Sequence, residues 1–264
     1  MAETEDGKKD VKKLAKNTGF LYLLSLSSQI VNLALIPFET RVLGSEAYGV
    51  IALSVAMSSI ITIVLDFGLI LSATERVVKL AGHAASLARL LGNVACAKAC
   101  LALAVGMVIV VLILFVPPFS EYRSLFLLYY LAYAVNAFLP DFFYRGHEDM
   151  RIITVRTVMV KVISALPIFF LLRGPSDMWV VPALLLAGNA AAVFFSYCDI
   201  RKRYRVEALT FDVKESFGIL RASFGFFVSR FSSVFYQSMN SVLLGFVYPG
   251  QAVVGFYGAA EKFL

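Results

Sequence analysis

The chain has 264 residues, of which 59% are hydrophobic and only 16% are charged, and its mean hydropathy is +0.79. A soluble protein of this length would not carry so much apolar surface, so the composition excludes a soluble globular domain and indicates a polytopic membrane protein. The net charge of +6 does not argue for nucleic-acid binding, because the basic residues cluster in short segments between apolar runs, as they do in membrane proteins.

Seven apolar runs are long enough to cross a bilayer, whose hydrocarbon core requires about 20 helical residues. We predict spans at 18–38, 49–71, 92–116, 124–144, 152–172, 178–198 and 222–247, and an eighth that begins near Val253. The first run is too long for a signal-peptide core and has no small-residue cleavage site, so we interpret it as an uncleaved span. Turn residues such as Gly44-Ser45 separate the runs. The predicted fold class is an all-α polytopic membrane protein.

Lys and Arg residues concentrate in alternate connections between the predicted spans. Segments 1–17 and 199–221 are the most basic, whereas the opposite side of the membrane receives only Arg41, Arg123 and Arg173. The positive-inside rule then predicts that the basic side, including the N-terminus, is cytoplasmic.

Several predicted spans carry polar side chains on one helical face, which should contact protein or water rather than lipid. The members are Ser25, Gln29, Asn32 and Glu39; Ser54, Ser58, Thr62 and Asp66; Tyr129, Tyr133, Asn136 and Asp141; and Arg230, Ser233, Gln237 and Asn240. Serine and threonine alone are weak evidence, because their hydroxyls commonly bond a carbonyl of their own helix.

Lys161 lies about nine residues into the predicted span 152–172, which places it roughly 14 Å deep. A lysine at such a depth costs on the order of 2.5–3.5 kcal/mol, so it normally faces a bundle interior or a wet cavity. Thr154, Thr157 and Ser164 share its helical face, and this polar stripe favours a pathway for an anionic group. Snorkelling or an internal packing role is the alternative.

Three further charges are predicted inside or near the membrane. Asp66 is interpreted either as the partner of Lys161 or Arg76 in a structural salt bridge, or as a proton or cation site. Lys98 and Arg156 lie about two turns and one turn from a cytoplasmic end, so we expect both to snorkel to the interface.

Sequence signatures of catalysis are absent. There is no G-x-x-x-x-G-K-[ST] phosphate loop, which excludes the usual mode of ATP hydrolysis. Neither His83 nor His147 belongs to a recognisable catalytic or metal-binding cluster. The three cysteines all lie inside apolar runs and predict neither a disulfide framework nor a metal site. We therefore predict no enzyme activity, no metal and no cofactor.

The first and seventh spans align when the sequence is shifted by about 201 residues, so that Leu43-Gly44 falls on Leu244-Gly245. The triplet Tyr48-Gly49-Val50 then resembles Val254-Gly255-Phe256, once the second copy is given a slightly longer loop. This predicts a parallel six-span repeat with its axis along the membrane normal, and chance similarity is the alternative. The predicted units are the N-terminus 1–17, a six-helix lobe 18–198, the inter-lobe loop 199–221 and the start of a second lobe at 222–264.

Segments 35–50, 66–76, 141–150 and 243–262 together carry a family resemblance. In order and spacing they resemble the bacterial polysaccharide flippases, the O-antigen and exopolysaccharide repeat-unit transporters of the superfamily that includes multidrug extruders. The resemblance implies two lobes around a cationic cavity, and movement of undecaprenyl-pyrophosphate-linked sugars to the outer leaflet of the bacterial cytoplasmic membrane. Tyr144-Arg145 departs from the family pattern, so the resemblance does not indicate which type of sugar is carried. We expect the remainder of the second lobe to lie beyond Leu264.

The residues and the resemblance together favour a lipid-linked oligosaccharide transporter. We expect Lys161, Arg230 and Arg41 to meet a pyrophosphate or an acidic sugar. The side chains expected to bond sugar hydroxyls are those of Gln29, Asn32, Gln237 and Asn240. Membrane lipids, a polysaccharide polymerase and glycosyltransferases are the other expected partners, and nucleic acid is not. The alternatives are an ion-coupled multidrug exporter that uses Asp66, and a membrane enzyme or scaffold of glycan assembly.

Overall fold

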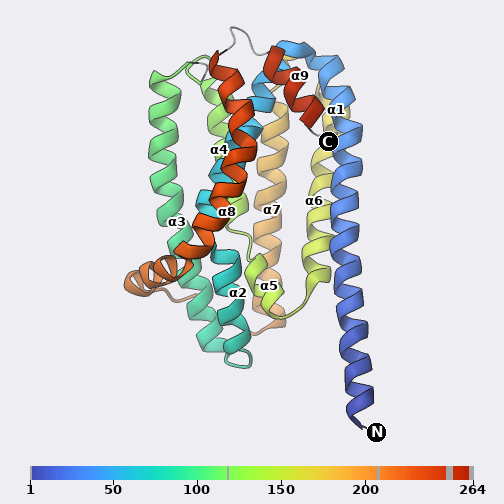
Figure 1. The fold of residues 1–264 in the computed structure, drawn as a ribbon, viewed down its shortest axis with the longest axis vertical. Coiled ribbons are helices and arrows are strands. Elements are labelled where there is room, and N and C mark those ends of the chain that lie inside the picture. Colours follow the sequence, from blue (N-terminus) through green and yellow to red (C-terminus); the bar gives the residue numbers. More distant parts are fainter. Residues whose placement is uncertain (1, 118, 207–208, 248–251, 262–264) are drawn as a thin grey trace.

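The computed structural model describes the chain except for residues 1, 118, 207–208, 248–251 and 262–264. The described part consists of helices and contains no strand (Figure 1), which confirms the predicted all-α class. The elements are α1 (Ala2–Asp66), α2 (Leu69–Lys79), α3 (Ala84–Phe115), α4 (Arg123–Ala137), α5 (Asp141–Gly146), α6 (Met150–Leu171), the 3₁₀ turn η1 (Pro175–Asp177), α7 (Val180–Arg203), α8 (Val213–Val247) and α9 (Ala252–Glu261).

Within the described residues, five segments are long and apolar enough to cross a membrane. They are Leu33–Lys79, Ala84–Phe115, Arg123–Gly146, Met150–Leu171 and Pro175–Arg203. Each predicted span from 49–71 to 178–198 coincides with one of them, and only 92–116 and 152–172 extend beyond it, by one residue each. The chain is therefore a multi-pass membrane protein, and its large exposed side chains, such as Leu103, Phe170 and Phe194, are those expected on a lipid-facing surface.

One backbone break divides the long first element, and a second one ends it. Gly44 has φ 76°, a conformation that glycine adopts without steric cost, and it interrupts α1 at the predicted turn. The predicted span 49–71 is not one continuous helix, because Phe67 (φ 47°) and Gly68 (φ 73°) stop the helix after Asp66. Gly68 also lies against α8, where an added Cβ would sit 2.8 Å from the carbonyl oxygen of Ser223.

The predicted span 124–144 is not one continuous helix. It consists of α4 and α5, with Pro140 immediately before Asp141. Proline has no N–H and disfavours helical geometry at the residue before it, so the chain breaks here. The helix that contains the predicted span 222–247 already starts at Val213, because the Asp212 carboxylate accepts the backbone N–H of Lys214 at 2.7 Å and caps α8 there.

The core has two parts along the length of the bundle. One cluster packs the Leu53 and Leu65 side of α1 against α3, α4 and α9, and the other packs α2 and α5 against α3 and α7 and includes the fully buried Phe143. In Figure 1, α8 and α9 lie across the face that α1 borders. Small residues permit this packing: a Cβ on Gly255 would lie 2.7 Å from the carbonyl oxygen of Ser45.

Candidate functional site

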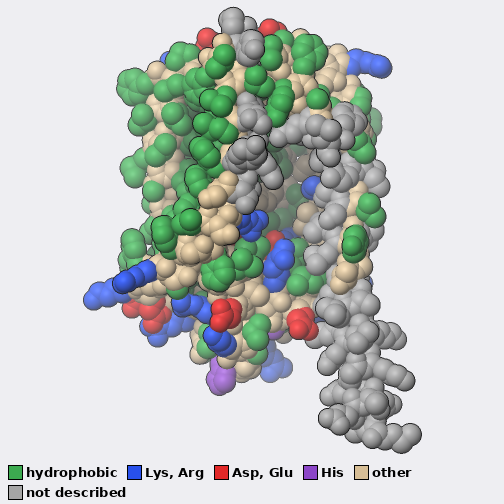
Figure 2. All heavy atoms as spheres, in the orientation of Figure 1, with side chains coloured by type: hydrophobic (Ala, Val, Ile, Leu, Met, Phe, Trp, Pro, Cys, Tyr) green, Lys and Arg blue, Asp and Glu red, His purple; other side chains and the backbone are tan. Residues whose placement is uncertain are grey.

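A polar cavity of about 130 Å³ lies where α1 ends, between α3, α4, α5 and α8. Four ionisable side chains line it: Asp66, Lys98, Asp141 and Arg230. Figure 2 shows basic side chains and an acidic one inside a hollow on the face that α8 and α1 border. Ionisable groups are rare within the membrane and normally serve a substrate or ion pathway, so this cavity is the candidate site.

Asp66 faces Arg230 across the cavity. Its Oδ2 lies 3.8 Å from Nη1 of Arg230, which is within ion-pair range but longer than a hydrogen bond. This oxygen is buried and has no hydrogen-bond partner in the described part of the chain. The sequence had suggested Lys161 or Arg76 as the partner of Asp66. The structure pairs Asp66 with Arg230 instead. A loosely held carboxylate is able to release its cation to a competing anion.

Lys98 does not snorkel as predicted, because it is buried against the break between α4 and α5. Its Nζ donates to the carbonyl oxygen of Ala137 at 2.5 Å and lies 5.7 Å from the centre of the Phe142 ring. Ala137 is the last residue of α4, so its carbonyl has no partner within the helix and belongs to the negative end of the helix dipole. The broken helix therefore supplies a site for a cation inside the bundle.

Arg156 is likewise turned inward, contrary to the prediction, and only 9% of its side chain is exposed. Its guanidinium forms an ion pair with Asp141 and donates from Nη1 to Oγ of Ser196 at 3.1 Å. Asp141 begins α5, where the positive end of the helix dipole favours a carboxylate. The two ends of the break at Pro140 thus hold charges of opposite sign.

An amide chain connects this cavity to α7. Asn136 donates from Nδ2 to Oδ1 of Asn189 at 3.1 Å, and Asn189 donates to the carbonyl oxygen of Ala132 at 3.0 Å. Asn189 is buried, and its hydrogen bonds hold α4 against α7. These bonds keep the wall of the cavity in place beside the break.

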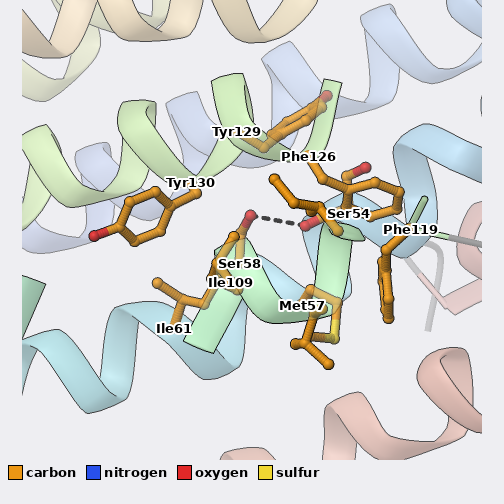
Figure 3. A pocket seen from close by; sticks show the side chains of 11 residues that line it. Ser54, Met57, Ser58, Ile61, Ile109, Phe119, Phe126, Tyr129 and Tyr130 are labelled. Carbon is orange, nitrogen blue, oxygen red and sulfur yellow. Dashed lines mark hydrogen bonds between the residues drawn. The ribbon is translucent and has the colours of Figure 1, made fainter. Parts of the chain in front are cut away.

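The serine stripe of span 49–71 does not form a second site. Ser54 and Ser58 line a space of about 10 Å³, enough for about one water (Figure 3). Their hydroxyls donate to the carbonyls of Val50 and Ser54 at 2.8 and 2.7 Å, and Thr62 does the same to Ser58. Each hydroxyl is thus hydrogen-bonded to a carbonyl of its own helix, which is why serine and threonine alone were weak evidence for a site.

Two of the eight predicted site residues, Asp66 and Arg230, meet in the cavity. Lys161 lies half-buried on α6 outside it, and no described residue forms an ion pair or hydrogen bond with its ammonium. Arg41 is exposed on α1, also away from the cavity. The side chains of Gln29, Asn32, Gln237 and Asn240 lie outside the described residues, so their predicted roles stay predictions.

Sequence reasoning missed Lys98, Asp141 and Arg156 as members of one site. The available signal was Pro140 followed by Asp141 inside an apolar run, because proline ends one helix and an acidic residue favours the start of the next. A break at this point leaves carbonyls that need donors, and the nearest unexplained deep cations were Lys98 and Arg156.

The sequence profile of a family described as "Polysaccharide biosynthesis protein" matches residues 14–264. The chain is 24% identical over 256 residues to a protein of Shigella dysenteriae and 20% identical over 248 residues to one of Escherichia coli (strain K12), each named "Putative O-antigen transporter". The alignments cover 94% of this chain in both cases, and 62% and 60% of these relatives. The chain thus spans about three-fifths of their length. No solved structure matches it significantly.

Proposed function

Because the chain belongs to the polysaccharide biosynthesis protein family, we propose that it forms the first lobe of a transporter that moves polysaccharide units across the bacterial cytoplasmic membrane. The cargo is an oligosaccharide linked to undecaprenyl pyrophosphate, which moves from the cytoplasmic to the outer leaflet. The observation that carries this proposal is the cavity of paired charges at the break between α4 and α5. Charged groups inside a membrane cost free energy, and they normally mark a substrate or ion pathway.

Arg230 is the residue that first meets the pyrophosphate. Its side chain is half exposed and lies 3.8 Å from Asp66, so the pair is open on one side. A guanidinium binds a phosphate through two parallel hydrogen bonds, which the longer contact with Asp66 does not provide. The incoming pyrophosphate therefore competes with Asp66 for Arg230. When Arg230 binds the pyrophosphate, the positive charge of Lys98 in the same cavity still stabilises the Asp66 carboxylate.

Lys161 is the second cation on the proposed path. It lies near the middle of α6, is half-buried, and has no acidic partner among the described residues. Its point charge suits a mobile polyanion that passes through several orientations. Arg41 and the four amide residues Gln29, Asn32, Gln237 and Asn240 remain the proposed contacts for the acidic or hydroxyl groups of the sugar.

The contact between α1 and α9 supports a two-lobe arrangement. The repeat proposed from the sequence matches Gly49 with Gly255, and a Cβ on Gly255 would lie 3.1 Å from the backbone nitrogen of Gly49. Residues on a two-fold axis meet their own equivalents. We therefore propose that α8 and α9 open the second lobe, that the axis lies along the membrane normal, and that the lobes rock about this contact. The basic segments support a cytoplasmic N-terminus.

The test is complementation of a flippase-deficient strain by a full-length transporter that contains this lobe. Arg230→Ala and Lys161→Ala should abolish polysaccharide export while the protein still reaches the membrane, and Lys161→Arg should retain part of it. Arg221→Ala is the matched control, because Arg221 is exposed on the same helix outside the cavity. Wild-type export by Arg230→Ala would remove the cavity from the transport path.

The unbonded oxygen of Asp66 favours a second candidate, an ion-coupled exporter of small molecules. In that case Asp66→Asn would abolish transport, whereas Arg230→Ala would retain it. Drug susceptibility and polysaccharide export, measured on the same two variants, separate the candidates.

A further inference from the structure

A lateral groove of about 860 Å³ lies between α6 and α7, on the other side of Arg156 from the polar cavity. We propose that it holds one acyl chain of an anionic phospholipid, whose phosphate meets Arg151 at the mouth. This site is separate from the transport path, and the proposal does not depend on what the protein transports.

The two helices close the groove at one end. They approach each other closely at Gly188, where a Cβ would lie 2.5 Å from Oγ of Ser164 and 3.1 Å from Cγ1 of Val160. Ser164 also donates to the carbonyl oxygen of Leu184 at 3.3 Å, which joins the helices at this level. Any larger residue at position 188 would push the helices apart, so glycine sets the closed end.

The length of the groove matches one leaflet. It extends along α6 from Ile163 to Arg151, which corresponds to about 18 Å at ~1.5 Å per residue. Half of the hydrocarbon core is about 15 Å thick. An extended acyl chain that enters at Arg151 therefore reaches the closed end near Gly188.

The wall changes from polar to apolar along this length. Val155, Met159 and Ile163 form an exposed ridge on α6, and Phe195 faces them from α7 with 66% of its surface exposed. Such side chains offer an acyl chain contacts on two sides, whereas a flat lipid-facing helix offers them on one. A chain held in this way exchanges more slowly than the surrounding lipid.

The charges at the mouth favour an anionic headgroup. The carboxylate of Asp149 pairs with Arg203 at 2.9 Å, Asp199 accepts the Tyr144 hydroxyl at 3.0 Å, and Glu148 is also engaged. Arg151 is exposed and forms no ion pair with any described residue. Of the three arginines that line the groove, Arg156 and Arg203 are paired with Asp141 and Asp149, so the positive charge of Arg151 is the one left to attract an anionic headgroup.

Two adjacent alanines on α7 provide a matched test. Ala191 lines the groove, whereas Ala190 is also exposed but lines a different surface hollow beside Phe194 and Tyr197. Native mass spectrometry of the purified chain should show phosphatidylglycerol retained by the wild type and by Ala190→Phe, and lost from Ala191→Phe. Equal retention by Ala190→Phe and Ala191→Phe would overturn the proposal.

The headgroup is tested by arginine substitutions. Arg151→Ala should weaken phosphatidylglycerol binding about fivefold, the effect of one interfacial cation. Arg201→Ala should leave it unchanged, because Arg201 lines the other hollow. Equal effects of the two substitutions would mean that only the general basic surface attracts the lipid, and would refute the role of Arg151.

Photo-crosslinking identifies the occupant directly. Phosphatidylglycerol with a diazirine near the end of its acyl chain should label Met159, Ile163 or Phe195, and phosphatidylcholine should compete poorly. Labelling spread evenly over all lipid-facing helices would refute a built site. Displacement by a low concentration of polyprenyl phosphate would assign the groove to the isoprenoid tail of a cargo, and so reject the phospholipid.

Discussion

Replacement of Arg156 by methionine is the sharpest test of the buried charge network. The change removes the ion pair with Asp141 and the hydrogen bond to Ser196, while keeping an unbranched apolar chain. Loss of one partner of a buried pair costs about 3–5 kcal/mol, because the remaining charge is left without compensation. The side chain of Asp141 is 26% exposed and lies at the start of α5, so we expect the lower end, about 3 kcal/mol.

The double variant Asp141→Asn/Arg156→Met should be more stable than Arg156→Met alone. It removes both charges together, so no uncompensated ion remains in the bundle. We expect a loss of about 1 kcal/mol, which is about 2 kcal/mol smaller than the loss expected for Arg156→Met alone.

Unfolding of the purified protein in mixed detergent micelles, followed by circular dichroism against increasing denaturing detergent, gives the free-energy differences. Arg201→Met is the control, since Arg201 is exposed near the end of α7, and its effect should stay within about 0.5 kcal/mol. If Arg156→Met and Arg201→Met destabilise equally, or if the double variant is no more stable than Arg156→Met, the inferred buried ion pair is wrong.

Three further predictions follow from individual residues. Gly68→Ala should destabilise the protein more than Gly82→Ala, since both have positive φ but only Gly68 would bring a Cβ within 2.8 Å of α8; equal unfolding midpoints would refute the close contact. Lys98 should resist an amine-modifying reagent that labels exposed Lys202, as peptide mass spectrometry can show, and equal modification would mean that Lys98 reaches the interface. Single cysteines at Lys9 and Lys214 should be protected from an impermeant thiol reagent applied to intact cells, whereas one at Pro118 should react; the reverse pattern would invert the proposed orientation.

Local patterns in the sequence were sufficient for the class of fold. Long apolar runs predicted membrane helices, because the thickness of the bilayer sets a minimum length for any helix that crosses it. Gly44 predicted the break in α1, since only glycine adopts its φ of 76° without cost. The hydrogen bonds of the Ser54 and Ser58 hydroxyls could also be predicted from the sequence, because the carbonyl that each hydroxyl binds lies one turn earlier in the same helix.

The membership of the site was decided by tertiary structure. Asp66 and Arg230 lie far apart in the sequence, and no periodicity indicates which face of α8 meets the end of α1. Lys98 and Arg156 were expected to reach the interface, because a deep cation with no known partner minimises its cost by snorkelling. Packing brings Lys98 to the carbonyl of Ala137 and Arg156 to Asp141, and these contacts compensate the charges inside the bundle. The sequence by itself determined which segments are long and apolar enough to cross a membrane, and it predicted the break at Gly44, because those features depend on neighbouring residues. Which charges compensate one another depends on distances between helices, and only the packed structure sets them.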